Sequence, residues 1–495
     1  MEEKMLYKAE RKIIGGELDF TTGIHIGSGD EGVWIDSTIV KTKEGKPFIP
    51  GTTIAGIFRQ LAEENFTQAR VNDLFGCIKK PDGSRENCAS RLIFCDAFLS
   101  GESQDRSGYR NGVGIKRDSL TSREGSLFSL ETVEKPKFDF KLIIDNPKGS
   151  DMAIIKPILA EFQSGRVAIG ADKSRGLGWV ELYDLKVVNI SPTDIDDFVD
   201  YLVDDIDIMN SPNLELNEVK TNGDKNHIEI KYNLALENED ASLIVSSGVE
   251  GFSANADQTL MKDKDDRFFI PGSSIKGPLR AQAERIVRHL KANFVCDPTD
   301  PDNSCSAGIK EVKKNNKKVT KEEIEENSCP ICRIFGNGYL ASKIFFADVY
   351  DKTEQITQII ENVAIDRFTG GGLDGAKFNT EVTTAVNLKG KIILKDVEKW
   401  EAGLIAFVMR DWIMGDIRIG FGKMKGYGRC KVDLEKITLC WQDENWLKDK
   451  NITAGKKRKS GFYNYAALKE ESLELDKYKG IMEGLITKLE NEVRK

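Results

Sequence analysis

Apolar residues recur along the chain in two alternating spacings. Residues 226–236 (NHIEIKYNLAL) alternate polar and apolar side chains, which predicts a half-buried β-strand. A Pro-Gly turn follows at 271–272, and the next segment has its apolar residues at helical spacing, at Ile275, Leu279, Ile286 and Leu290. Because strand and helix periods alternate in this way, we expect an α+β fold of short sheets with helices packed on them.

A set of landmarks occurs twice in the same order, which indicates an internal duplication. The segment FIPGTTIAGIFR at 48–59 returns as FIPGSSIKGPLR at 269–280, an offset of 221 residues. Further on, the segments at 115–117, 131 and 176–178 return at an offset of 250, as Ile365-Asp366-Arg367, Glu381 and Gly426-Tyr427-Gly428. We therefore predict a first repeat at 1–190 and a second repeat at 226–440.

Two segments lie outside the repeats. The linker 191–225 contains seven aspartates between 194 and 207, with apolar residues at helical spacing, and this pattern favours an acidic linker helix. The segment 441–495 begins with a basic loop at 455–461 and continues as a tail rich in Glu, Lys and Leu, which predicts a helix.

The charge balance first argues against a nucleic-acid partner. The 495 residues carry a net charge of −8, but the seven linker aspartates account for most of it. Local charge decides binding, so we expect a basic channel on one side and an acidic surface elsewhere. No apolar run is long enough to span a bilayer, and the chain opens on charged residues, which indicates a soluble, cytoplasmic protein.

Hydroxyl residues follow the Pro-Gly turn in both repeats, where they could cap a helix whose N–H groups attract phosphate. The second repeat adds basic residues at multiples of four, whereas the first keeps Arg59 and has Ala55 at the position of Lys276. An ordinary capped amphipathic helix is the alternative. The candidate phosphate-binding residues are Thr52, Thr53, Arg59, Ser273, Ser274, Lys276 and Arg280.

A glycine-rich loop with cations closes each repeat, at 170–178 and 420–428. Glycines allow close approach of the backbone to an anion, although a tight hairpin would use them equally. The spacing of a mononucleotide P-loop is absent. The candidate cations of the two loops are Lys173, Arg175, Lys423 and Lys425.

The second repeat carries 39 additional residues with four cysteines, Cys296, Cys305, Cys329 and Cys332. A Cys-x-x-Cys pair with two further cysteines offers four thiolates to tetrahedral zinc. His289 could replace one of them, and free thiols in a flexible insertion are the alternative. Because a cytoplasmic protein rarely forms disulfides, we interpret Cys77, Cys88 and Cys95 of the first repeat as core residues without a metal.

Together, the Ile-Pro-Gly-Ser-Ser-Ile-Lys-Gly turn, the following Phe-Gly, the Ile-Asp-Arg segment and the Gly-x-Gly loop resemble the RAMP superfamily, specifically fused backbone subunits of type III CRISPR effector complexes, of a type III-D-like kind. The resemblance implies two ferredoxin-like, RNA-recognition-motif-like domains in a prokaryotic complex. It also implies as partners guide crRNA, single-stranded target RNA, a large polymerase- or cyclase-like subunit, other RAMP subunits and a small subunit.

The resemblance further implies one catalytic aspartate per repeat, in a loop before the Pro-Gly turn. Asp36 and Asp257 occupy that place at the shared offset of 221. A carboxylate there could hold Mg²⁺ or Mn²⁺, or orient a ribose 2′-hydroxyl for attack on the adjacent phosphate, whereas each could also be an ordinary loop residue. With three histidines in the chain, a histidine-dependent mechanism in both repeats is disfavoured.

The same resemblance implies a hairpin thumb near Arg117 and Arg367, where both could bind RNA. The first repeat has Lys116 in place of Asp366, which puts an equivalent hairpin there in doubt. The implied activity is endonucleolytic cleavage of target RNA at regularly spaced sites. A non-catalytic RNA-binding scaffold, a crRNA-processing RAMP endonuclease and a pure protein-interaction module remain as alternatives.

Overall fold

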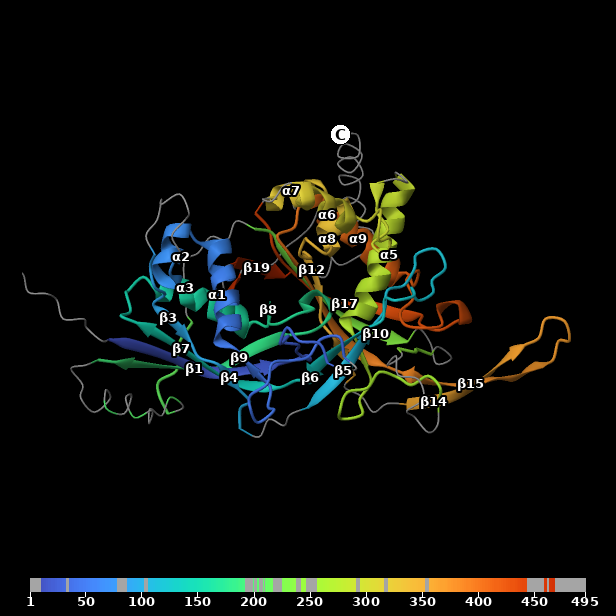
Figure 1. Ribbon diagram of the computed structural model, residues 1–495, viewed down its shortest axis with the longest axis horizontal. Coiled ribbons are helices and arrows are strands. Elements are labelled where there is room, and N and C mark those ends of the chain that lie inside the picture. The colour runs from blue at the N-terminus through green and yellow to red at the C-terminus, as the bar shows by residue number, and fades with distance from the viewer. Residues whose placement is uncertain are drawn as a thin grey trace, which may run out of the picture.

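The computed structural model shows two repeats, each a sheet with helices on one face (Figure 1). The elements described below belong to residues 10–32, 35–77, 87–101, 106–191, 199, 203, 208, 210–216, 225–236, 242–245, 256–290, 294–315, 319–351, 356–442, 458–460 and 463–467. The predicted α+β class and duplication are confirmed. Among the described helices, none combines the length and apolar character needed to cross a bilayer.

The first repeat is organised around β1 (Arg11–Phe20), which pairs antiparallel with β7 (Lys137–Asp145) and β9 (Trp179–Ile190). The short strands β3 (Leu92–Phe94) and β8 (Val167–Ala168) complete the order β3-β7-β1-β9-β8. A continuous apolar core joins this sheet to its helices, which are α1 (Gly51–Asn65), α2 (Gln68–Phe75) and α3 (Met152–Gln163).

The second repeat has the same order around β10 (His227–Leu236), which lies between β16 (Asn387–Lys395) and β17 (Cys430–Cys440). The edge strand β12 (Ile344–Phe346) corresponds to β3. Its core includes α5 (Gly272–Leu290), α8 (Pro330–Phe335) and α9 (Lys399–Ile413). Along β10, Tyr232 and Leu234 are buried, as the predicted alternation requires.

The buried stripe of α5 differs from the predicted one in its second half. Ile275 and Leu279 are buried as expected, but the stripe continues through Ala283 and Val287. Leu290 is 42% exposed, and Ile286 is only partly buried. Residues four apart form a ridge that is inclined to the helix axis, so the buried stripe of α5 winds away from Ile286 and Leu290 as the helix proceeds.

Short strand pairs hold the segments on either side of the helices. In the first repeat, β2 (Phe48–Ile49) pairs with β4 (Ala97–Phe98), and in the second β11 (Phe269–Ile270) pairs with β13 (Val349–Tyr350). The insertion of the second repeat forms α6 (Cys305–Asn315) and α7 (Lys321–Glu326). Each glycine-rich loop contains one turn of 3-10 helix, η1 (Lys173–Arg175) or η3 (Lys423–Lys425).

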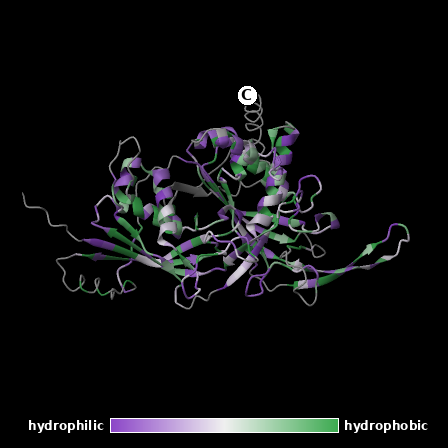
Figure 2. Ribbon diagram, viewed as in Figure 1, coloured by the Kyte–Doolittle hydropathy of each residue, from purple (hydrophilic) through white to green (hydrophobic). Residues whose placement is uncertain are grey.

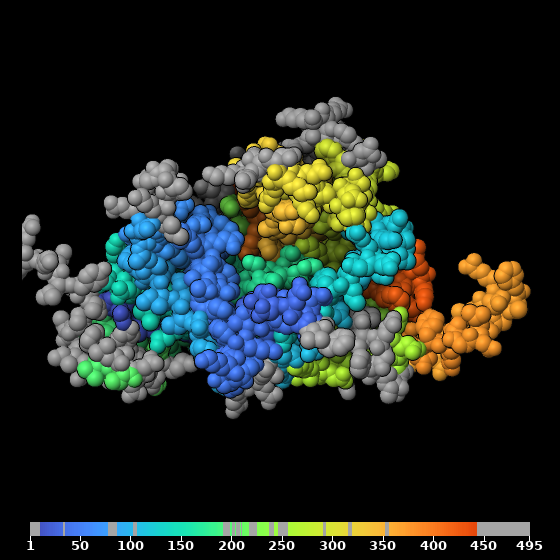
Figure 3. All heavy atoms as spheres, in the orientation of Figure 1, coloured from blue at the N-terminus to red at the C-terminus, as the bar shows by residue number. Residues whose placement is uncertain are grey.

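Each repeat also has a hairpin outside its main sheet, and the two hairpins differ. The strands β5 (Ser107–Gly112) and β6 (Phe128–Val133) enclose a long loop, whereas β14 (Ile356–Ile365) and β15 (Gly372–Ala385) form a long arm that projects from the molecule (Figures 1 and 3). At the tip of this arm Asp366 Oδ1 accepts bonds from the backbone N–H groups of Phe368 and Thr369. Lys116 cannot replace that carboxylate, which explains the different turn in the first repeat.

The repeats pack directly on each other. Lys391 Nζ and Lys395 Nζ of β16 donate to the carbonyls of Gly165 and Arg166, which follow the C-terminal end of α3, at 2.6 and 2.8 Å. Cations at a helix C-terminus are favourable because its carbonyls carry partial negative charge. A small apolar cluster around Trp179 and Phe345 lies beside these contacts.

Three further expectations have mixed outcomes. The linker helix at 194–207 and the tail after 467 lie outside the described residues, apart from Val199 and Val203. Within the expected basic loop, β18 (Arg458–Ser460) forms a hairpin with β19 (Tyr463–Ala467), which adds to the second sheet by pairing with β17. The interpretation of Cys77 and Cys88 as unpaired was wrong, because they face each other in an antiparallel bridge and form a disulfide.

Candidate functional site

Asp36 lies on an exposed loop that is held against the hairpin of the first repeat. Its Oδ2 accepts the backbone N–H of Ser129 on β6 at 2.6 Å and the Ser129 hydroxyl at 3.1 Å. The Asp36 N–H donates back to Ser129 Oγ at 3.2 Å. Hydrogen bonds from backbone N–H groups fix a carboxylate in position. Asp36 as a whole remains exposed to solvent.

Asp257 repeats this arrangement in the second repeat. Its Oδ2 accepts the backbone N–H of Asn379 on β15 at 2.7 Å, and its own N–H donates to the Asn379 carbonyl at 3.0 Å. Asp257 is also exposed. The two aspartates therefore share the same partner position on the two hairpins, in addition to the same position in the sequence.

A glutamate that is buried in the first repeat and partly buried in the second braces each of these loops. Glu131 of β6 accepts the backbone N–H of Ile39 at 3.0 Å and pairs with Lys41 at 2.6 Å. In the second repeat, Glu381 accepts from Leu260 at 3.0 Å and pairs with Lys262 at 2.9 Å. The recurrence of Glu131 and Glu381 was visible in the sequence, but their role in fixing the aspartate loops was not.

His25 supports the first loop from inside. It is buried, with Nδ1 2.6 Å from the Glu131 carbonyl and Nε2 3.1 Å from the hydroxyl of Ser37. Both ring nitrogens are therefore engaged next to Asp36, which makes His25 a structural support. The corresponding residue of the second repeat, Ser246, lies outside the described residues.

The helix N-termini differ from the expected hydroxyl caps. Helix α1 begins at Gly51, with Pro50 as N-cap and no side-chain cap. Instead, the first N–H of each helix donates to a carboxylate in the connection between two short strands. Gly51 donates to Asp96 Oδ1 at 2.7 Å, and Gly272 donates to Asp348 Oδ1 at 2.8 Å. The candidates Thr52, Thr53, Ser273 and Ser274 therefore lie within the first helical turn.

Lys276 and Arg280 of α5 are engaged inside the protein. Lys276 donates to Ser174 of the first repeat at 2.8 Å and to Ser342 at 3.3 Å, and burial lowers the pKa of Lys276 to about 7. Arg280 pairs with Glu284 at 3.1 Å and donates to the Gly336 carbonyl at 3.0 Å. Any phosphate would compete with these partners.

The two glycine-rich loops have different neighbours. In the first repeat the loop packs on α5, because a Cβ added to Gly176 would lie 1.7 Å from Asp348 Oδ1 and 2.8 Å from the Gly272 nitrogen. Burial lowers the pKa of Lys173, and Arg175 pairs with Asp172. In the second repeat the loop is open, with Met424 87% exposed.

The open loop of the second repeat still holds its cations close to aromatic rings. The Lys425 ammonium lies 4.7 Å from the ring centroid of Phe378, and Arg175 stacks on Phe128 at 5.2 Å in the first repeat. Burial lowers the pKa of Lys423. Arg367 is exposed at the tip of the projecting hairpin, whereas Arg117 binds Glu284 of the second repeat at 2.7 Å.

A pocket of about 320 Å³ lies beside α1, in the place that corresponds to the covered surface of α5. Gly51 and Ala55 line this pocket where Gly272 and Lys276 of the second repeat meet the glycine-rich loop. Thr52 and Arg59 also line it. Arg59 pairs with Glu63 at 2.9 Å on the exposed side of the helix.

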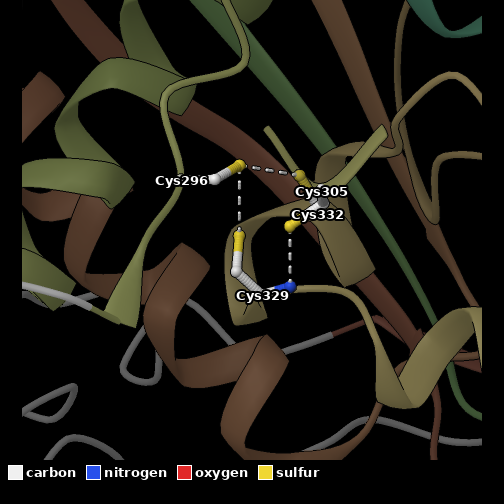
Figure 4. Close-up of side chains that lie close together, drawn as sticks. All are labelled: Cys296, Cys305, Cys329 and Cys332. Carbon is white, nitrogen blue, oxygen red and sulfur yellow. Dashed lines mark hydrogen bonds between the residues drawn. The ribbon is translucent and has the colours of Figure 1, made fainter. Parts of the chain in front are cut away.

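The four cysteines of the insertion converge (Figure 4). Their sulfur atoms all lie within 4.8 Å of one another, and Cys296 Sγ lies 3.6 Å from Cys332 Sγ and 3.8 Å from Cys329 Sγ. Zinc–sulfur bonds of about 2.3 Å in a tetrahedron place the sulfurs about 3.8 Å apart. The donor set and its spacing therefore fit structural zinc.

Hydrogen-bond donors surround this cysteine cluster. The Cys329 N–H donates to Cys305 Sγ at 3.2 Å, and Arg280 Nη2 donates to Cys332 Sγ at 3.3 Å. A hydrogen bond from the Cys296 thiol lowers the pKa of Cys305. His289 is exposed and does not belong to the cluster.

The aspartate loops offer a much smaller donor set. Among the described residues, neither Asp36 nor Asp257 belongs to a group of three or more metal-ligating side chains. Mg²⁺ commonly binds one or two carboxylates and completes its shell with water and substrate phosphates. A single fixed carboxylate therefore supplies few of the ligands that such a cation needs.

Comparison with known proteins agrees with the duplicated fold. Residues 17–181 and 240–431, more than half of the chain, match the RAMP superfamily. A protein of Methanocaldococcus jannaschii named "CRISPR system Cms endoribonuclease Csm3" is 24% identical over 200 residues, which cover 36% of this chain and 80% of that protein. A protein of the same name from Enterococcus italicus is 28% identical over 177 residues, covering 32% of this chain and 78% of that protein.

Proposed function

Because the chain belongs to the RAMP superfamily through both repeats, we propose that it is a fused backbone subunit of a type III CRISPR ribonucleoprotein, which binds crRNA and cleaves complementary target RNA. Its relatives are named as Csm3 endoribonucleases. The observation that carries the proposal is the recurrence of an exposed aspartate, fixed to the same hairpin position in each repeat. The base pairing of the guide selects the target, while the protein reads backbone and shape.

Each repeat acts as one ferredoxin-like RNA-binding unit in this proposal. The order β3-β7-β1-β9, with all neighbours antiparallel, supports this fold. In chain order the four strands are β1, β3, β7 and β9, and the first of them, β1, pairs with the third and the fourth, as in a ferredoxin-like sheet. The order β12-β16-β10-β17 supports the same assignment in the second repeat.

Asp36 and Asp257 each serve one cleavage site. The carboxylate orients the ribose 2′-hydroxyl of a displaced nucleotide toward its own phosphate. The bond from the 2′-oxygen to phosphorus forms as the bond from phosphorus to the 5′-oxygen breaks. The 2′-hydroxyl proton leaves to a base, and the departing 5′-oxygen takes up a proton. Bound Mg²⁺ or Mn²⁺ would stabilise charge on the phosphate.

Guide contacts fall on groups that remain accessible. In the first repeat these are Thr52, Thr53 and Arg59 beside the α1 pocket, and in the second Ser273 and Ser274. Lys423, Lys425 and Arg367 present cations on the open loop and the projecting hairpin. Lys173, Arg175, Lys276, Arg280 and Arg117 contribute by shaping the surface between the repeats, where their present partners hold them.

Structural zinc at Cys296, Cys305, Cys329 and Cys332 completes the proposal. Four thiolates hold the insertion to α8, a region whose own apolar cluster contains few residues. Zinc supplies folding energy in small segments of this kind. The metal acts in the architecture, away from the aspartate loops.

The test is cleavage of a labelled target RNA by the assembled complex, with Asp36→Ala and Asp257→Ala compared. Each variant should lose its own product band and keep the others. Asp30→Ala, an exposed acid of the same first loop, is the matched control and should leave all bands. Unchanged bands in both aspartate variants would identify a non-catalytic scaffold, and cleavage of precursor crRNA by the subunit alone would identify a guide-processing endonuclease.

A further inference from the structure

The loop 113–127 of the first hairpin lies against the second repeat (Figure 3). Arg117 Nε donates to Glu284 Oε2 at 2.7 Å, and Arg117 Nη2 donates to Glu284 Oε1 at 3.4 Å. Arg123 donates to the carbonyl of Thr299 in the insertion. The Glu284 side chain is 1% exposed, so this ion pair is shielded from solvent.

Both of these contacts lead to the cysteine cluster. Glu284 Oε1 also accepts Arg280 Nε at 3.1 Å, and the same guanidinium donates through Nη2 to Cys332 Sγ at 3.3 Å. One continuous path therefore runs from Arg117 through Glu284 and Arg280 to a candidate zinc ligand.

The second path uses the short turn that follows Cys296. Arg288 Nη2 donates to the Cys296 carbonyl at 3.1 Å. Asp297 Oδ1 accepts the backbone N–H and the hydroxyl of Thr299 at 2.8 and 2.7 Å. The Thr299 carbonyl of this turn accepts a hydrogen bond from Arg123. The position of Cys296 therefore determines where the hairpin loop contacts the insertion.

The first repeat offers an internal comparison. Arg59 pairs with Glu63 and donates to the Gly76 carbonyl at 3.4 Å, as Arg280 pairs with Glu284 and donates to Gly336. The Glu63 side chain, however, is 41% exposed. Within the described part of the chain, the buried form of this pair occurs in the repeat that has both the cysteine cluster and a docked hairpin loop.

We propose that metal binding at the four cysteines docks the hairpin loop 113–127 of the first repeat on the second repeat, with Arg280 as the positioning residue. Groups that hydrogen-bond to metal ligands commonly orient them and tune the site. Here the same guanidinium also orients Glu284 toward Arg117, and the metal holds Cys296 and its turn beside α8. The inference rests on the zinc assignment of the proposed function and not on RNA cleavage.

Hydrogen–deuterium exchange of the full chain tests this proposal, with zinc bound and after removal by a chelator. Peptides from 113–127 contain no cysteine, yet their exchange should rise roughly tenfold or more on zinc removal, because a buried ion pair is lost. Peptides from β7 in the first sheet and from the free tip at 366–371 should not change. Unchanged protection at 113–127 after complete zinc loss overturns the proposal.

If the protein unfolds when zinc is removed, variants measured with zinc bound still test the proposal. Arg280→Gln, measured at saturating zinc, should retain one zinc per chain while 113–127 loses its protection. Arg117→Ala should expose the loop whether or not zinc is bound, and Arg59→Ala is the matched control with no effect on either. Full protection of the loop in Arg280→Gln contradicts the positioning role. Intact docking with absent RNA cleavage would contradict only the proposed function.

Discussion

Arg110 of the first repeat binds Asp348 of the second repeat through a contact of 2.7 Å between Nη2 and Oδ2. The Asp348 side chain is completely buried, and its other oxygen accepts the Gly272 N–H at the start of α5. One carboxylate thus joins a hairpin strand of one repeat to a helix of the other. In the first repeat the corresponding Asp96 is exposed and also accepts from its helix.

Replacing Arg110 by alanine should destabilise the full chain by about 3–5 kcal/mol, because Asp348 is left buried without its cation. Arg106→Ala removes an ion pair with Asp265 in which both side chains are more than one third exposed, and it should cost less than about 1 kcal/mol. Chemical denaturation of both variants measures the difference. Equal losses would contradict the assignment of Arg110 as the buried link.

Gly176 and Gly426 offer a matched pair at equivalent places of the two glycine-rich loops. Both have positive φ, at 120° and 97°, so alanine strains the backbone in either case, by about 1–3 kcal/mol. At Gly176 the new Cβ would also collide with Asp348, whereas at Gly426 no heavy atom of the described residues, apart from its chain neighbours, lies within 4 Å.

Gly176→Ala should therefore lose clearly more stability than Gly426→Ala and should loosen the contact between the repeats. Thermal unfolding gives the first quantity, and limited proteolysis between the repeats gives the second. A larger loss of thermal stability in Gly426→Ala than in Gly176→Ala would contradict this prediction, because the open loop would then contribute more to stability than the packed loop.

Much of this organisation could be predicted from local patterns. The duplication follows from ordered landmarks, the fold class follows from alternating periods, and the cysteine cluster follows from the Cys-x-x-Cys spacing. These features depend on residues near each other in the chain or on repetition. Glu131 and Glu381 were visible in the same way, although their partners were not.

The partners at the helix N-termini and between the repeats depend on tertiary structure. Asp96 and Asp348 lie 45 and 76 residues from the N–H groups that they bind, so no local pattern predicts the pairing. Lys276 was expected on an open basic stripe, but the first repeat covers it. A signal was available, because an aspartate recurs at corresponding positions after β3 and β12.

Lys276 should make the stability of the protein depend on pH. Burial lowers its pKa from 10.5 to about 7 in the folded protein, so between these values the unfolded chain binds more protons. The contribution of this group to stability therefore rises as the pH rises from 7 toward 10 and is lost as the pH falls through about 7. Lys276→Met removes the effect.

The free energy of unfolding of the wild type minus that of Lys276→Met should become more favourable between pH 7 and pH 9. Lys310→Met, at an exposed lysine of α6, is the control and should give a difference that does not change with pH. A pH-independent difference at Lys276 would show that its ammonium stays charged between Ser174 and Ser342.

Metal analysis of the purified chain gives the most direct prediction for the insertion. The wild type should contain about one zinc per chain, because four sulfurs at tetrahedral spacing form a closed structural site. Cys329→Ser removes one thiolate and should lower the zinc content, whereas Cys95→Ser in the first repeat should not. Since only deprotonated thiols bind zinc, acidification should release the metal as the four thiolates take up protons. Wild-type protein without zinc, or equal zinc contents in the two variants, would contradict the site.

Because the insertion carries the turn that meets Arg123, zinc loss in Cys329→Ser should also increase protease cleavage within 113–127 of the other repeat.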